Sequence, residues 1–228
     1  MEFPNITVNL KAYPHSLGEK SVKVSEDIAE AGSETGIGVG VSPQYADLYR
    51  VTGQVDIPVF AQHVDSLEPG RGTGYLLPEA AEMAGAVGSL VNHSEHQLDL
   101  EEIEKIVDRL EEVGLISLVC AEDVETAGKV AAFGPDIVAV EPPELIGTGR
   151  SVSQAQPEII ENTVKRVHEV DPDVHVLCGA GVSSGEDVET ALELGAEGIL
   201  IASAVVKADD PKGKMVELAE GALRAEKA

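Results

Sequence analysis

The chain has 228 residues and a formal net charge of −25, because 41 Asp and Glu face only 16 Lys and Arg. Nucleic acids and anionic membrane surfaces are bound by clustered Lys and Arg, so this charge balance excludes both as expected partners. Since 43% of the residues are apolar, the acidity does not indicate a disordered chain, and a sizeable core is expected. No apolar run approaches the roughly 20 residues of a membrane span, and the start MEFPNITVNL lacks a signal-peptide pattern. We therefore expect a cytoplasmic protein.

Short β-branched runs alternate with longer amphipathic segments from one end of the chain to the other. The runs predicted as strands are residues 6–10, 37–41, 57–61, 89–92, 115–119, 137–140, 174–177 and 198–201. The clearest helix is 99–113, where Asp99 and Glu102 form a capping pair at the start and Gly114 follows the end. Segments 156–170 and 185–194 repeat the helical period, the second behind a Ser184 cap.

The count of eight strand–helix units gives roughly 28 residues per unit, close to the size of a βαβ motif. Alternating strands and helices predict a parallel sheet with helices outside it. We therefore predict an α/β fold, a (β/α)8 TIM barrel near the small end of its size range. An open doubly wound sheet remains the alternative. No Pro-, Gly- or Ser-rich linker divides the chain, so residues 1–228 are predicted to form a single domain.

In such a barrel the active site lies at the carboxyl ends of the strands. Lys11 follows the first predicted strand, His93 the fourth and Glu141 the sixth. A Lys, a His and a Glu from three strands are thus predicted to converge at one mouth. After the seventh and eighth strands, the turns 178–181 and 202–203 present backbone N–H groups, which suit a phosphate dianion. The pattern favours acid–base chemistry on a small phosphorylated molecule.

Several short motifs, in collinear order and each at a predicted strand end, carry a family resemblance. They are Val8-Asn9-Leu10-Lys11, Ala61-Gln62-His63-Val64, Gly72-Thr73-Gly74, Asn92-His93-Ser94-Glu95, Val119-Cys120, Val140-Glu141-Pro142, Ile146-Gly147-Thr148-Gly149 and the turns at 179–181 and 202–203. Through them the chain resembles the triosephosphate isomerase family, in its compact archaeal type, from end to end. The resemblance implies interconversion of dihydroxyacetone phosphate and D-glyceraldehyde 3-phosphate, in glycolysis and gluconeogenesis, with no metal and no organic cofactor.

The resemblance also implies a role for each site residue. Glu141 would be the base that moves a proton between two substrate carbons, and His93 the neutral imidazole that polarises the carbonyl. Lys11 would stabilise the enediolate and the phosphate, and Asn9 would orient the substrate oxygens. Residues 141–149 would form a closing lid. The backbone amides implied to hold the phosphate are those of Ile146, Gly147, Gly181, Ala202 and Ser203.

The chain departs from the common family pattern in the lid and in one phosphate turn. The lid carries Glu144 and Leu145 where an aromatic and a small residue are common, and Pro143 makes a double proline beside the base. The turn 179–181 reads Gly-Ala-Gly rather than Gly-Gly-Ser, which removes a hydroxyl donor. The resemblance further implies a homo-oligomer, either dimer or tetramer, in which segment 71–75 packs against a neighbouring subunit.

Some of these residues also have interpretations that involve no catalysis. His93 and His96, with Glu95 between them and His63 elsewhere, are an alternative set of metal ligands that lacks a clear further member. Glu141 before two prolines is also compatible with a simple strand end.

The cysteines and a glycine run have structural interpretations as well. Cys120 and Cys178 have no CxxC spacing, so we predict buried thiols rather than a disulfide framework or a zinc ribbon. The glycines at 36, 38 and 40 superficially match a dinucleotide loop, but we assign them to close backbone packing within a strand.

Three other function classes remain open: a metal-dependent phosphosugar epimerase, a Schiff-base aldolase, and a non-catalytic barrel used for binding or assembly. The aldolase needs a shielded lysine at a late strand end, and none precedes Lys207. The net charge raises a further question, because the implied substrate is an anion that such a protein repels. Molar salt shortens the Debye length to roughly 3 Å, so we interpret the acidity as adaptation to a salt-rich cytoplasm, as in a halophilic archaeon.

Overall fold

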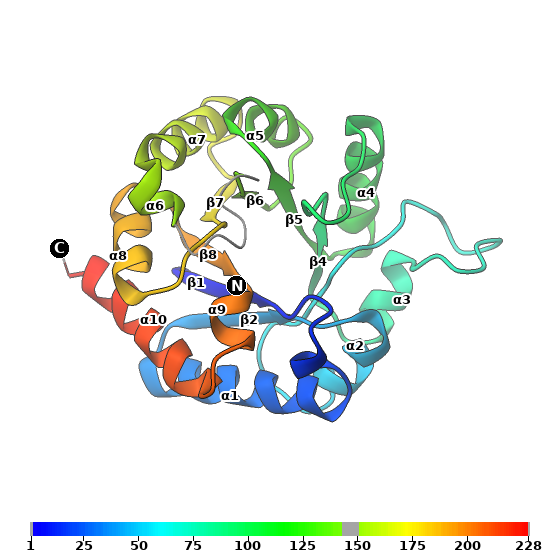
Figure 1. Ribbon diagram of the computed structural model, residues 1–228. Helices are drawn as coiled ribbons and strands as arrows, with labels where there is room; N and C mark the ends of the chain where they lie inside the picture. The colour runs from blue at the N-terminus through cyan, green and yellow to red at the C-terminus, as the bar shows by residue number, and fades with distance from the viewer. Residues whose placement is uncertain (1, 143–150, 228) are drawn as a thin grey trace.

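The computed structural model describes residues 2–142 and 151–227. Its strands lie at the centre, and the helices form a ring around them (Figure 1). The strands are β1 (Asn5–Asn9), β2 (Gly38–Ser42), β3 (Phe60–Ala61), β4 (Gly88–Val91), β5 (Ile116–Ala121), β6 (Ile137–Val140), β7 (His175–Cys178) and β8 (Gly198–Ile201). The helices are η1 (Pro14–Ser16), α1 (Glu19–Thr35), α2 (Tyr45–Thr52), α3 (Pro78–Met83), α4 (Leu100–Val113), α5 (Val124–Ala131), α6 (Val152–Ala155), α7 (Pro157–Val170), α8 (Gly185–Glu193), α9 (Ser203–Val206) and α10 (Pro211–Ala225).

The strands form one parallel sheet in the order β2-β1-β8-β7-β6-β5-β4-β3. The two ends of this order meet at a bridge between Val41 and Val59, where the Val41 N–H donates to the Pro58 carbonyl at 3.0 Å. The sheet is therefore rolled into a barrel that a single bridge closes. The predicted TIM barrel is confirmed, and the open doubly wound alternative is wrong.

The third strand is much shorter than the run 57–61 predicts. Only Phe60 and Ala61 pair with β4. Pro58 has no N–H to donate to a ladder, so the regular pairing begins only after it. The other strands lie within two residues of their predicted bounds, and β6 and β8 match at both ends.

Side chains on the strands alternate between two separate apolar layers. One cluster consists of strand residues, with only Phe3 added from outside the strands, so it fills the inside of the barrel; its buried members are Leu90, Leu118, Cys120, Ile137, Ala139, Leu177 and Leu200. The neighbouring residues Val91, Val119 and Val138 belong to the larger cluster that includes buried helix side chains. The period of two along each strand thus supplies both the filled interior and the surface that the helices cover.

Side-chain caps fix the starts of the two best-predicted helices. Asp99 accepts the Glu102 N–H at 2.9 Å and so caps α4. The predicted capping pair is one-sided, because the Glu102 carboxylate accepts from Ser66 Oγ at 2.7 Å instead. Ser184 caps α8 in a reciprocal capping box with Asp187, as its predicted position requires.

The glycine run proves to be divided between a helix end and a strand. Gly38 and Gly40 lie in β2, and a Cβ on Gly38 would meet the Glu2 carbonyl at 2.5 Å, so close backbone packing is confirmed there. Gly36 does not lie in the strand: its φ of 79° ends α1 in the left-handed conformation that favours glycine.

Both cysteines are free and buried, as predicted. Burial is the main cause that raises the pKa of the Cys120 and Cys178 thiols, so both stay neutral. Of the helices in the described part of the chain, none combines the length and the apolar character that a bilayer crossing needs.

Candidate active site

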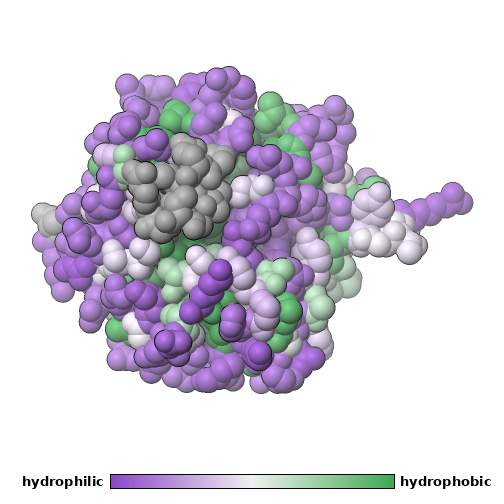
Figure 2. All heavy atoms as spheres, in the orientation of Figure 1, coloured by the Kyte–Doolittle hydropathy of each residue, from purple (hydrophilic) through white to green (hydrophobic). Residues whose placement is uncertain are grey.

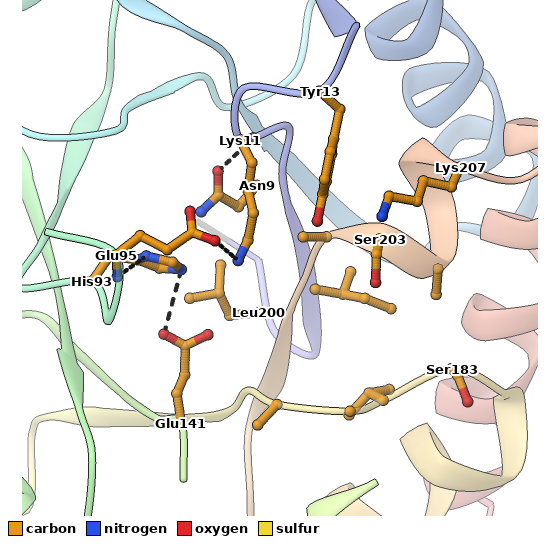
Figure 3. A pocket seen from close by; sticks show the side chains of 16 residues that line it. Asn9, Lys11, Tyr13, His93, Glu95, Glu141, Ser183, Leu200, Ser203 and Lys207 are labelled. Atoms are coloured by element: carbon orange, nitrogen blue, oxygen red, sulfur yellow. Dashed lines mark hydrogen bonds and ion pairs between the residues drawn. The ribbon is translucent and has the colours of Figure 1, made fainter. Parts of the chain in front are cut away.

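A cavity of about 410 Å³ opens at the carboxyl ends of the strands (Figure 3). It brings together the sequence-predicted residues Asn9, Lys11, His93, Glu141, Gly181, Ala202 and Ser203. They reach one place because the carboxyl ends of parallel strands meet at one edge of the barrel. The two remaining predicted residues, Ile146 and Gly147, lie outside the described residues, as does most of the predicted lid.

Lys11 is held at the mouth by a strained turn and by an ion pair. Its φ is 49°, and its N–H donates to Asn9 Oδ1 at 2.9 Å. Its ammonium lies 2.8 Å from Glu95 Oε1, and its side chain is only 11% exposed. The side chain therefore points into the site rather than into solvent.

Gln62 braces this turn from the end of β3, which is separated from β1 by β2. Its Nε2 donates to the carbonyls of Lys11 at 3.0 Å and Ser42 at 3.1 Å, and it lies 3.2 Å from Asn9 Oδ1. One amide group thus ties the ends of β1 and β2 to the residue after β3. Since Asn9 Oδ1 is engaged in this way, the amide nitrogen is the atom of this side chain that remains to donate to a ligand.

His93 is directed into the cavity by the residue before it. Asn92 has a φ of 58°, a conformation that Asn tolerates better than most residues. Its side chain donates to the Cys120 carbonyl at 2.9 Å and accepts the Leu98 N–H at 2.9 Å, which fixes the loop on both sides. His93 itself is buried.

The tautomer of His93 follows from its hydrogen bond. Its Nδ1 accepts the Glu95 N–H at 3.1 Å. A ring nitrogen that accepts a hydrogen bond carries no proton, so the ring is assigned as the neutral tautomer with its proton on Nε2. The only N–H proton of the ring, the one on Nε2, then faces the cavity.

Glu141 lies opposite this proton. It follows β6, its N–H donates to the Ala121 carbonyl at 2.8 Å, and its side chain is 9% exposed. Its Oε2 lies 3.7 Å from His93 Nε2, beyond hydrogen-bond distance, and finds no hydrogen-bond partner among the described residues. A buried carboxylate oxygen without a partner is costly to hold, which is typical of a functional group rather than a structural one.

The floor beneath Glu141 is a glycine. A Cβ at Gly179 would lie 2.4 Å from Glu141 Cγ. The bare backbone of Gly179 therefore leaves the room in which the carboxylate is packed.

The other end of the cavity is formed by the turns after β7 and β8. Ala180 and Gly181 have φ values of 60° and 74°, which turn the chain sharply after β7. Asp187 Oδ2 accepts the N–H groups of Ser183 at 2.9 Å and Ser184 at 3.0 Å, and this fixes the far side of the turn. Ala202 and Ser203, where α9 begins, complete this end.

The alternative metal ligands do not point to one centre. The rings of His63 and His96 are tilted by 39° with their centroids 4.3 Å apart, and His63 Nε2 lies 3.4 Å from Asp65 Oδ1. Burial and the neighbouring His96 lower the pKa of His63. Across residues 2–142 and 151–227, no group of three or more His, Cys, Asp and Glu side chains is placed to hold a metal ion.

Several contributors to the site received no catalytic or substrate-binding role from the resemblance. They are Tyr13, Gln62, Glu95, Ser183 and Lys207. Glu95 serves twice, since its carboxylate pairs with Lys11 and its N–H fixes His93. Its place two residues after His93 on one strand end is the signal that could have identified it.

The sequence is similar to known proteins over nearly its whole length. The family model described as Triosephosphate isomerase matches residues 4–222. A triosephosphate isomerase of Methanothermus fervidus is 51% identical over 96% of this chain and 98% of its own length. One from Methanobacterium bryantii is 46% identical over 95% and 96%, and one from Methanocaldococcus jannaschii is 47% identical over 93% and 97%.

Proposed function

We propose a mechanism for this chain, which belongs to the triosephosphate isomerase family. It is an intramolecular aldose–ketose isomerase, which interconverts dihydroxyacetone phosphate and D-glyceraldehyde 3-phosphate. The reaction moves one proton between two adjacent carbons and one between their oxygens. It needs a base beside the carbons, a proton donor beside the oxygens and a stabiliser for the negative enediolate between them.

Glu141 is the base in this proposal. It takes the proton from the carbon next to the carbonyl and returns it to the neighbouring carbon. Its buried Oε2, which has no partner among the described residues, has its lone pairs available for that proton. A Glu base paired with a neutral His is the established pattern of this family, so the assignment follows that pattern and the geometry supports it.

His93 is the proton donor to the oxygens. The Glu95 N–H on Nδ1 keeps the ring neutral with its proton on Nε2, so the ring can donate to the carbonyl oxygen and then relay protons between the two oxygens. The ammonium of Lys11 compensates the charge of the enediolate. Asn9, with its Oδ1 engaged by Lys11 and Gln62, orients a substrate oxygen through its amide nitrogen.

The phosphate lies at the end of the cavity that the turns after β7 and β8 form. The amides of Gly181, Ala202 and Ser203 bind its oxygens there. Ile146 and Gly147 are added from the family pattern alone.

The observation that carries these roles is the placement of Glu141 Oε2 and His93 Nε2, 3.7 Å apart at the mouth of the barrel. A coupled isomerase assay on E141D tests it, since the shorter side chain retracts the carboxylate by about 1 Å and is expected to lower kcat on the order of 100-fold. E104D, on the exposed face of α4, is the matched control. An E141D enzyme with the kcat of wild type would remove Glu141 from this role.

Because the chain belongs to this family, the isomerase activity takes the place of the epimerase, aldolase and binding-module alternatives. The aldolase also lacks its shielded lysine, since Lys207 is exposed. We place the activity in glycolysis and gluconeogenesis in the cytoplasm, carried out by residues 1–228 as one domain.

The segment 71–75 is proposed to pack against a second copy of the chain. It belongs to a loop between β3 and α3 that leaves the barrel, the cyan loop at the right of Figure 1. The base of this loop is closed, because the Asp65 N–H donates to the Leu76 carbonyl at 2.8 Å. Four of the exposed large apolar side chains belong to this loop, α2 and α3: Tyr45, Tyr49, Tyr75 and Met83. Light scattering tests the proposal, with a dimer or tetramer expected and a strict monomer contradicting it.

The acidic surface is proposed to reflect a salt-rich cytoplasm. Hydrophilic side chains cover most of the face shown in Figure 2. The proposal rests on the net charge of −25, whereas the relatives named above come from methanogens and do not bear on it. Stability and activity are expected to rise from low to molar salt. A protein that is fastest and most stable at low salt would contradict this proposal.

A further inference from the structure

We propose that Lys207 is a second cation for the substrate phosphate and that Tyr13 holds it in position. The proposal rests on the isomerase mechanism, because it assumes that the phosphate lies at the end of the cavity that the turns after β7 and β8 form. Contact with Lys207 would help the site to select a phosphorylated substrate, which the proton-transfer residues do not do.

Lys207 lies at the phosphate end and away from the reacting groups. It directly follows α9, and its N–H donates to the Ser203 carbonyl at 3.1 Å. It lines the same cavity as His93 and Glu141. In Figure 3 its ammonium points toward Tyr13 above Ser203, on the side of the cavity opposite His93. Its position places it beside a phosphate bound at Ser203.

Tyr13 holds this ammonium without neutralising it. Lys207 Nζ lies 4.4 Å from the centroid of the Tyr13 ring, over its face. The ring quadrupole attracts a cation, so the long side chain is directed toward the cavity. Within the described residues, no carboxylate lies within 4.0 Å of Lys207, whereas Lys11 is paired with Glu95. The full charge of Lys207 is thus available to a ligand.

The charge balance of the cavity shows why a second cation matters. Its lining carries two lysines, Lys11 and Lys207, and two glutamates, Glu95 and Glu141. Without Lys207 the lining has a net negative charge, and the surrounding protein adds a net charge of −25. A dianionic phosphate entering such a site is repelled, and a cation at the end where the phosphate binds reduces this repulsion.

The test is isomerase kinetics of K207M, which keeps the length of the side chain and removes its charge. KM for glyceraldehyde 3-phosphate is expected to rise about tenfold, comparable to the loss of one charge-assisted hydrogen bond, while kcat stays within about twofold. The rise should shrink as salt is added, because screening weakens the lost attraction. K207R should keep most of the affinity.

K165M is the matched control, because Lys165 is an exposed lysine on α7 and its loss changes the net charge by the same amount. KM of K165M should equal that of wild type. Y13L, which removes the ring face, should raise KM part of the way, whereas Y13F, which keeps it, should not.

Assays are run at the lowest salt at which each variant remains folded by circular dichroism. An unchanged KM in K207M, with an active wild type, overturns the proposal and leaves the mechanism standing. Equal KM increases in K207M and K165M also overturn it, since the effect would then come from net charge alone. A wild type that binds inorganic phosphate but isomerises nothing would contradict the proposed mechanism instead, and the Kd for phosphate in K207M would then decide the role of Lys207.

Discussion

Replacing Gly179 with Ala measures how tightly the base is packed. The atoms nearest to a Cβ at this position all belong to Glu141: Cγ at 2.4 Å, and Cδ and Oε1 at 3.1 Å. Carbon atoms in contact normally lie about 3.5–4.0 Å apart, so the Glu141 side chain must move by about 1 Å. Gly179 is not among the residues with a positive φ, so alanine adds no backbone strain of its own.

The expected effect is therefore confined to the base. A reacting group misplaced by about 1 Å loses on the order of 100-fold in rate, which corresponds to about 2.7 kcal/mol in the activation barrier. In G179A, kcat should fall by that factor, while KM stays within about twofold because the atoms nearest to the added Cβ belong to Glu141 and not to the phosphate-binding residues. The coupled assay at saturating substrate measures the first quantity, and a substrate titration measures the second.

G53A is the matched control. Gly53 follows α2, away from the cavity, and a Cβ there meets nothing closer than the Tyr49 carbonyl at 3.5 Å. Both variants should melt close to wild type, since the displaced atoms in G179A belong to a side chain that can rotate. A G179A enzyme with kcat within twofold of wild type would refute the idea that the carboxylate occupies the space above this glycine.

Two further predictions concern the groups around the site. Q62A removes the donor shared by the carbonyls of Lys11 and Ser42, so the free energy of unfolding measured in urea should fall by about 1–3 kcal/mol. The kcat should also fall, because Lys11 shifts. A variant with the wild-type free energy of unfolding and the wild-type kcat would contradict the bracing role. Burial lowers the pKa of His63, so below its unfolded pKa of about 6.5 the unfolded state binds more protons, and stability falls as the pH drops. H63F cannot titrate at this position, so its Tm should fall less than that of wild type between pH 7.5 and 5.5; equal falls would show that His63 is not responsible.

The fold was predictable because its signals are local. Runs of β-branched residues, the 3.6-residue stripe of α4 and the caps Asp99 and Ser184 each depend on residues within a few positions of one another. The prediction was wrong where a single residue interrupts a pattern. Pro58 shortens β3, and the turn conformation of Gly36 ends a helix rather than continuing into a strand.

The site was only partly predictable, because its contacts join distant positions. The strand-end rule identifies Lys11, His93 and Glu141, but nothing local indicates that Gln62 braces Lys11 or that Glu95 pairs with Lys11, 84 positions away. Such hydrogen bonds depend on distances between strands that are far apart in the sequence. Those distances are set by packing.

Local periodicity and composition are enough to predict eight strand–helix units in a strongly acidic barrel, and they indicate which residues follow the strands. Folding into the barrel is what places Glu141 Oε2 3.7 Å from His93 Nε2 and Lys207 over the ring of Tyr13. Closure of the barrel brings together side chains nearly 200 positions apart, at distances that local sequence cannot specify.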